Sequence, residues 1–290
     1  MASRPPADPA TPASPGVRAP DRALLWLEQR ALFELGALAA AAPWLRLLGR
    51  GDHHPVLVLP GFTASDASTT PLRWQLRSWG YWAHGWGLGR NLGPTPDVLT
   101  GLVERLDAVH KRHGRKVSLV GWSLGGIYAR ELARQFPGYV RSVITLGSPY
   151  RMSLSDRSSV SRLLDLLVGG FDRELIEGWV SEEERGALTV PATSIYTRTD
   201  GIVRWHTCID SEGPNRENIE VLGSHSGLGV NPAVLYAIAN RLAQPEDDWR
   251  PFQPPVALRR FYPKPVTWSA VPQADEERTG RPARRAEAAS

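Results

Sequence analysis

Cysteine is almost absent from this sequence of 290 residues, and lysine and methionine are scarce. Cys208 is the only cysteine, so an internal disulfide and a cluster of thiolate metal ligands are both excluded. Lysine occurs only at positions 111, 116 and 264, and arginine supplies nearly all of the positive charge. The composition therefore gives no sign of an oxidising compartment or of a cysteine-based metal centre.

Long uncharged apolar runs are also missing. Residues 31–48 are largely apolar, but Glu34 and Arg46 interrupt them, and the segment is short for a membrane-spanning helix. The first 20 residues are rich in proline and alanine and lack the apolar centre of a secretory signal. We therefore expect a cytoplasmic protein.

The charge balance does not favour a nucleic-acid partner. The formal net charge is +4, and much of the basicity lies near the end of the chain, for example at Arg281, Arg284 and Arg285. No stripe of alternating basic and aromatic residues is present, so we expect no nucleic acid to bind. The content of 42% hydrophobic and 22% charged residues is that of an ordinary globular protein.

Composition divides the chain into four parts. Residues 1–20 are predicted to be disordered, 21–50 to form an amphipathic helix, 51–245 to form the main domain, and 246–290 to form a tail rich in proline and arginine. Within the second part, apolar residues recur at helical spacing: Leu24, Leu27, Ala31, Leu35 and Leu38. We expect this face to pack onto the domain, and weak contact with a membrane surface is the alternative.

Strand and helix patterns alternate through the main domain. Short apolar strands are predicted at 55–59, 81–86, 116–120, 140–146, 193–196 and 219–222. Helices are predicted at 71–79, from Val98 to a stop at Gly114, at 127–135, and after the cap Asn231-Pro232. This alternation predicts an α/β fold with a mostly parallel sheet and helices on both faces.

Residues 150–189 interrupt this alternation of strands and helices. They contain apolar helical segments at 160–168 and 171–180 and an acidic run at 182–184. We interpret them as a small helical cap inserted over the site. One ordinary crossover helix with long loops is the alternative.

The pentapeptide Gly121-Trp122-Ser123-Leu124-Gly125 stands between a predicted strand and a predicted helix. In that context Gly-x-Ser-x-Gly is typical of a nucleophile elbow, a sharp turn that exposes the serine hydroxyl. Gly121 and Gly125 lack side chains, so the strand and the helix can approach each other closely. Ser123 is therefore the candidate nucleophile.

A nucleophilic serine needs a base and an orienting carboxylate. Of seven histidines, His225 stands in Gly223-Ser224-His225-Ser226-Gly227, a loop after the last predicted strand, and is the candidate base. Asp200 follows the strand at 193–196 and is the candidate acid, although a turn-forming role is the alternative. Asp210 and Glu212 are the rival carboxylates.

An oxyanion would be stabilised by backbone N–H groups. We predict that Leu124, the residue after the nucleophile, supplies one, and that Phe62 supplies the other from the loop after the first strand. A plain Pro60-Gly61 turn is the alternative. Five of eleven tryptophans lie near these motifs, and they indicate either an apolar acyl pocket or ordinary core: Trp74, Trp79, Trp82, Trp86 and Trp122.

Together these motifs resemble the α/β-hydrolase superfamily, specifically its lipase- and esterase-like members such as bacterial triacylglycerol lipases. The matching segments are 56–62, 121–126, 145–149, 199–203 and 223–225. The resemblance implies a triad of Ser123, His225 and Asp200 on a sheet of the eight-stranded type. One departure is Pro60-Gly61, where such lipases usually have His-Gly.

These observations predict a serine hydrolase that cleaves a carboxylic ester through an acyl-enzyme. We expect a small-molecule, apolar ester with a medium or long acyl chain as the substrate, and no metal or organic cofactor is required. Three alternatives stay open: an acyltransferase with the same triad, a non-catalytic lipase-like binding protein, and a peptidase or amidase.

Overall fold

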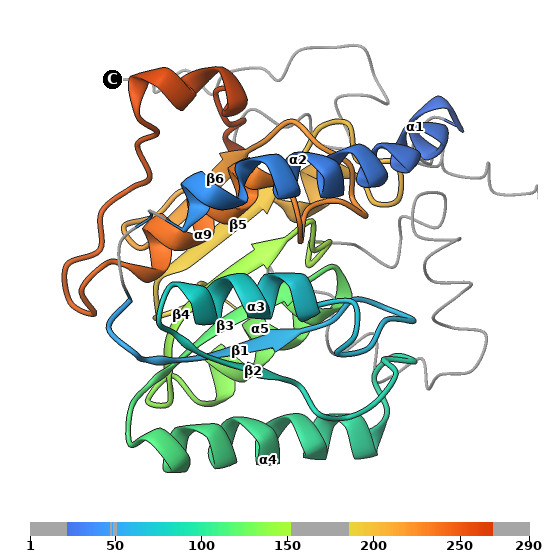
Figure 1. Cartoon of the computed structure of the whole chain (residues 1–290). Helices are drawn as coiled ribbons and strands as arrows, with labels where there is room; N and C mark the ends of the chain where they lie inside the picture. The colour runs from blue at the N-terminus through green and yellow to red at the C-terminus, as the bar shows by residue number, and fades with distance from the viewer. Residues whose placement is uncertain (1–21, 47, 49–50, 152–185, 269–290) are drawn as a thin grey trace, which may run out of the picture.

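The computed structural model describes residues 22–46, 48, 51–151 and 186–268, which build a parallel sheet between layers of helices (Figure 1). The sheet order is β2-β1-β3-β4-β5-β6. The strands are β1 (Pro55–Leu59), β2 (Trp82–Gly85), β3 (Val117–Trp122), β4 (Val140–Leu146), β5 (Ala192–Tyr196) and β6 (Arg216–Glu220). The helices are α1 (Arg22–Leu27), η1 (Glu28–Arg30), α2 (Ala31–Leu45), α3 (Thr70–Ser78), α4 (Pro96–His113), α5 (Leu124–Gln135), η2 (Trp205–Cys208), α9 (Pro232–Leu242) and η3 (Val256–Phe261).

The predicted alternation of strands and helices is confirmed, with two differences. The described residues contain six strands instead of the eight that the resemblance implies, because the chain before β1 is helical from Arg22 to Leu45. The last strand begins at Arg216, three residues earlier than predicted. It lies at the edge of the sheet, where polar side chains are tolerated and an apolar pattern marks only part of the strand.

Alternate residues of each strand enter two separate cores. Val56 and Val58 of β1 pack with α3 and α9 on one face, whereas Leu57 and Leu59 pack with α4 and α5 on the other. The five side chains of β1 are all buried. A strand buried on both faces needs a continuous apolar run, and Pro55–Leu59 supplies one.

The strand register brings the predicted site residues to one edge of the sheet. Leu59 pairs with Gly121, Gly121 with Thr145, and Leu146 with Ile195. Because all these strands are parallel, the loops that follow them leave from the same carboxyl edge. The loops after β1, β3, β5 and β6 carry the predicted oxyanion donor, nucleophile, acid and base.

The N-terminal segment, residues 22–45, differs from the predicted single amphipathic helix. Leu27 and Leu35, expected on the packed face, are 41% and 49% exposed. Other large apolar side chains of the segment are also exposed: Leu25, Trp26, Leu32, Phe33 and Trp44. Polar residues face the domain instead, because the surface beside them consists of loop backbone that offers N–H donors.

The end of α2 does pack onto the domain as expected. Leu45 is buried in the core, Leu38 and Ala41 pack against it, and α2 lies beside α9 (Figure 1). None of the described helices is long and apolar enough to cross a membrane. Contact of the N-terminal segment with a membrane surface stays a prediction.

Several predicted segments lie partly or wholly outside the described residues. These are the N-terminal 1–20, most of the cap at 150–189, and the tail beyond 268. The described part of the tail packs on the domain: Phe252 contacts the core, and the buried Tyr262 donates its hydroxyl to Ala233 O at 2.7 Å. These contacts fasten 246–268 to α9.

The crossing of β3 and α5 depends on glycine. A Cβ at Gly121 would lie 2.3 Å from Gly125 O, which is backbone that cannot move aside. We predict that Gly121→Ala lowers the free energy of unfolding by roughly 1–3 kcal/mol or more. The matched control is Gly138→Ala, where a Cβ would meet no atom within 4 Å. Urea unfolding checks both, and equal stability of the two variants would contradict the prediction.

Candidate active site

Ser123 occupies a strained turn between β3 and α5. Its φ of 52° and ψ of −122° lie outside the conformations that L residues ordinarily adopt. Ser123 N donates to Leu146 O at 2.9 Å, which ties the turn to the end of β4. Strain of this kind costs about 1–3 kcal/mol and persists only where the surrounding structure holds it.

Two glycines allow the close approach that holds this turn. A Cβ at Gly125 would lie 2.3 Å from Leu59 O, and one at Gly126 would lie 2.0 Å from Ser148 Oγ. The start of α5 therefore contacts the end of β1 and the loop after β4 directly. These contacts explain why Gly125 of the predicted elbow, and Gly126 after it, have no room for a side chain.

Asp200 and His225 meet across the loops that follow β5 and β6. His225 Nδ1 donates to Asp200 Oδ2 at 2.6 Å, and both side chains are buried. The other carboxylate oxygen, Oδ1, accepts from Ile202 N at 2.9 Å and from Val203 N at 2.7 Å. With both oxygens engaged the carboxylate has a fixed orientation, and it selects the imidazole tautomer whose Nε2 is the proton acceptor.

The pKa of His225 is raised above its ordinary value. Burial alone would lower it, but the negative charge of Asp200 and the hydrogen bond to that carboxylate outweigh the burial, and the charge of Glu28 adds to them. The imidazolium is therefore stabilised in this site. A base of this kind accepts a proton readily near neutral pH.

Ser123 and His225 both border on the turn after β4. A Cβ at Gly147 would lie 3.0 Å from His225 Nδ1, and Gly147 directly follows Leu146, which accepts from Ser123 N. Trp122 Nε1 also donates to His225 O at 3.1 Å. Among the described residues no hydrogen bond joins Ser123 Oγ to His225, and in ligand-free sites such bonds commonly form only with substrate.

The rival residues lie in other environments. Asp210 is buried in an ion pair with Arg130 at 2.9 Å, and Glu212 is exposed. His84 Nε2 lies 2.8 Å from His113 Nε2, away from the carboxyl edge. The structure thus brings Asp200, and neither rival carboxylate, to His225.

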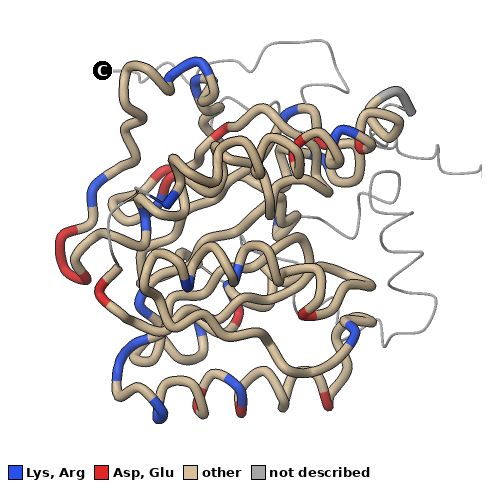
Figure 2. The backbone as a smooth tube through the Cα atoms, viewed as in Figure 1, with Lys and Arg blue, Asp and Glu red and all other residues tan. Residues whose placement is uncertain are grey.

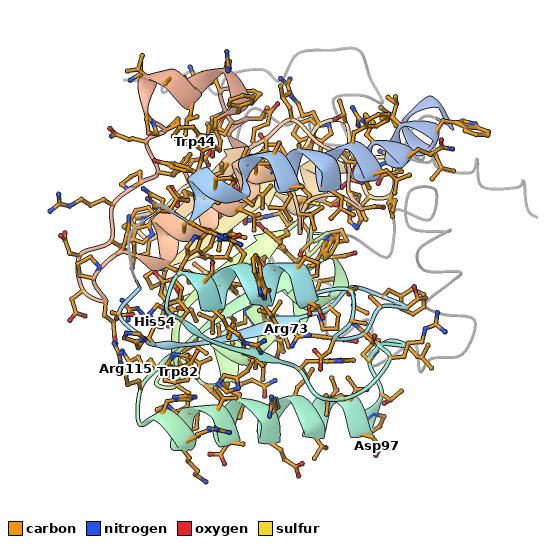
Figure 3. The ribbon with its side chains drawn as sticks, viewed as in Figure 1. Trp44, His54, Arg73, Trp82, Asp97 and Arg115 are labelled. Carbon is orange, nitrogen blue, oxygen red and sulfur yellow. The ribbon has the colours of Figure 1, made fainter. Side chains whose placement is uncertain are left out.

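A second Asp-His-Ser chain lies at the amino end of β1. Asp52 hydrogen bonds to His54, and His54 Nε2 lies 2.9 Å from Ser118 Oγ. His54 and Ser118 have no exposed surface, and burial lowers the pKa of His54 to about 4. Figure 3 shows His54 near Arg115, which pairs with Asp52. A substrate carbonyl could not reach this serine, so the chain has a structural role.

The loop after β1 lies against the nucleophile. A Cβ at Gly61 would lie 3.2 Å from Ser123 Cβ, and Thr63, with φ of 61°, bends the loop further. Within the described part of the chain, the N–H groups of Phe62 and Leu124 donate to no other residue. Both groups are therefore available to an oxyanion beside Ser123.

Of the two interpretations of the clustered tryptophans, acyl pocket or core, the described residues favour core for two of them. Trp79 and Trp86 are buried in opposite cores, whereas Trp74 and Trp82 are 52% and 55% exposed. Trp79 follows α3 and Trp86 follows β2, and each enters the core on its own face of the sheet. The interpretation of Trp79 and Trp86 as core is confirmed.

Sequence reasoning missed three charged residues that contact the acid and base loops. Glu28 accepts from His225 N at 3.0 Å, Glu34 accepts from Ser224 N at 2.7 Å, and Arg30 donates to Gly223 O at 3.2 Å. Figure 2 shows acidic positions on the N-terminal segment in this region. The available signal was the charge itself, which interrupts an otherwise apolar segment.

Comparison with known proteins supports the fold. No protein-family model matches the chain. Over 109 residues it is 32% identical to human serine hydrolase BPHL, a match that covers 34% of this chain and 37% of that protein. The crystal structure of Aspergillus fumigatus lipase B is similar with a TM-score of 0.51 and 17% identity, covering 68% of this chain and 55% of that one.

The chain has the α/β-hydrolase fold, and it is similar to lipase- and esterase-like serine hydrolases of that superfamily. Its matches span only about a third to a half of the length of the two proteins named above.

The two serines that contact or approach a histidine can be distinguished chemically. We predict that a fluorophosphonate labels the wild-type protein and Ser118→Ala, whereas Ser123→Ala is not labelled. The reason is that Ser118 has no exposed surface and lies inside the sheet, whereas Ser123 is 7% exposed on the turn after β3. Mass spectrometry of the labelled peptide is the measurement, and labelling that persists in Ser123→Ala would refute the assignment.

Proposed function

We propose that the chain is a carboxylic ester hydrolase that uses Ser123, His225 and Asp200. The proposal rests chiefly on one observation, the buried 2.6 Å hydrogen bond between His225 and Asp200 beside the strained turn of Ser123. Nucleophilic catalysis by serine requires such a base and such an orienting carboxylate. Similarity to human serine hydrolase BPHL and to a fungal lipase agrees with it.

The first step is acylation. His225 Nε2 takes the proton of Ser123 Oγ as that oxygen attacks the ester carbonyl carbon. The carbonyl oxygen becomes an oxyanion, and the N–H groups of Phe62 and Leu124 stabilise it. The imidazolium then gives its proton to the alcohol oxygen as the carbon–oxygen bond breaks, which leaves an acyl-enzyme and a free alcohol.

Deacylation repeats these steps with water as the nucleophile. His225 takes a proton from water, the hydroxide oxygen attacks the acyl carbon, and Ser123 Oγ leaves with the proton that the imidazolium returns. Asp200 keeps the imidazole oriented and stabilises its charged form through both steps. No step calls for a further group, and an apolar acyl chain remains the proposed substrate class.

The rate should depend on pH through His225. Because the pKa of His225 is raised and only the neutral imidazole accepts a proton, kcat/KM should rise with an apparent pKa above about 6.5. Asp200→Asn should lower kcat by about 10⁴-fold, because the preferred tautomer is lost, and should move this limb to lower pH. Stopped-flow hydrolysis of a p-nitrophenyl ester measures both, and a pH-independent rate between pH 5 and 8 would contradict the role of His225.

A chain-length series tests the substrate class and separates hydrolysis from acyl transfer. We expect turnover of p-nitrophenyl esters, with higher kcat/KM for butyrate or longer acyl chains than for acetate, and a loss of about 10³-fold or more in His225→Ala. Added alcohol or thiol acceptors should not raise the rate of p-nitrophenol release. Efficient transfer to an acceptor with little free acid would instead identify an acyltransferase.

Stable labelling without turnover of any ester would argue against a hydrolase. Absence of both labelling and turnover in folded wild-type protein would favour a lipase-like binding protein. A preference for anilides over the matching esters would favour an amidase.

A further inference from the structure

We propose that the N-terminal segment is part of the catalytic apparatus, with Glu28 as the positioning residue that joins the acid loop to the base loop. The acid loop is residues 197–203, and the base loop is residues 222–227. This inference rests on the proposed function, since it assigns Glu28 to the support of the same acid and base.

Glu28 accepts three backbone hydrogen bonds from the two loops. Its Oε1 accepts from Gly201 N at 2.9 Å and from His225 N at 3.0 Å, and its Oε2 accepts from Ser226 N at 2.8 Å. Gly201 directly follows the acid Asp200, and the other two donors are the base His225 and the residue after it. A single carboxylate therefore fixes the backbone on both sides of the Asp200–His225 hydrogen bond.

Arg30, two residues further along the chain, forms a second bridge between the two loops. Its guanidinium donates to Thr199 O at 3.3 Å and to Gly223 O at 3.2 Å, again one group from each loop. Glu28 and Arg30 both lie in η1, the 3-10 turn between α1 and α2. The two loops thus present N–H donors to the negative carboxylate of Glu28 and carbonyl acceptors to the positive guanidinium of Arg30.

Glycines in both loops make room for the N-terminal segment. A Cβ at Gly201 would lie 2.3 Å from Leu24 O, and one at Gly227 would lie 1.3 Å from Glu34 Oε2. Glu34 fills that space and accepts from Ser224 N at 2.7 Å and Ser224 Oγ at 3.2 Å. The acid and base loops are therefore shaped to receive this segment.

The charges around His225 come from the acid loop and from two elements of the N-terminal segment, η1 and α2. Asp200 lies on the acid loop, Glu28 and Arg30 lie in η1, and Glu34 lies in α2. Burial by itself would raise the pKa of Glu28, but the N–H groups of Ser226, Gly201 and His225 lower it overall, so the carboxylate is ionised at neutral pH. Burial raises the pKa of Glu34. Glu28 is therefore the charge of this segment that reaches His225 directly.

The test compares Glu28→Ala and Glu28→Gln with the wild type. Active sites are first counted by fluorophosphonate labelling, and kcat and KM for p-nitrophenyl butyrate are then expressed per labelled site. We expect Glu28→Ala to lower kcat by about 10- to 100-fold with KM changed less than about threefold, because the imidazole loses its position while Glu28 touches no substrate.

Glu28→Gln retains the shape of the side chain and removes its charge. We expect a smaller fall in kcat and a shift of the acidic limb of kcat/KM to lower pH, since the charge of Glu28 raises the pKa of His225. A role in stability alone would not move this limb. The matched control is Glu104→Gln, the same chemical change at an exposed position of α4 on the opposite face of the sheet, and it should keep wild-type values.

A kcat per site within twofold of wild type in Glu28→Ala would overturn the proposal. If Glu28→Ala does not fold, an unchanged kcat and pH limb in Glu28→Gln would overturn it instead. Failure of the proposed function is a separate result, because it appears as absence of Ser123 labelling and of ester turnover in the wild type itself.

Discussion

The close crossing of β3, β1 and α5 around Ser123 constrains the whole site. Backbone atoms meet there without side chains between them, at Gly121 and Gly125, and the turn at Ser123 takes a conformation that an isolated peptide would avoid. The turn is held in place by the sheet, because β1 and β3 beside it are buried on both faces. The position of Ser123 is thus fixed by the sheet, and the loops after β5 and β6 must bring the acid and the base to it.

The acid and base are brought there by loops, which have less intrinsic rigidity than strands. Their positions depend on polar contacts: the Asp200–His225 hydrogen bond, the N–H groups of Ile202 and Val203, and the contacts with Glu28 and Arg30. A carboxylate that accepts several N–H groups holds backbone more firmly than neutral pairs do. The polar face of the N-terminal segment therefore complements the apolar sheet in ordering the site.

Most of the fold and the candidate site could be predicted because their signals are local. Pro55–Leu59 is a continuous apolar run, Asn231-Pro232 caps a helix, and Ser123 and His225 each stand among glycines at the end of a strand. The contacts of Glu28 could not be predicted in this way, since they join residues 173 to 198 positions apart. Whether the clustered tryptophans form a pocket could not be predicted either, because residues close in sequence can lie on opposite faces of the sheet, as Trp79 and Trp86 do.

The amino-acid sequence by itself determined the alternation of strands and helices, the elbow at Ser123 and the loops in which an acid and a base could stand. Apolar periodicity and glycine spacing are sufficient for this, because they act over a few residues. Only the tertiary structure decided that Asp200 and not Asp210 meets His225, and that residues 22–45 turn charged side chains toward the domain. Those outcomes depend on which backbone N–H groups and which cations are left to be paired once the sheet has formed, and such pairing is a property of the assembled surface.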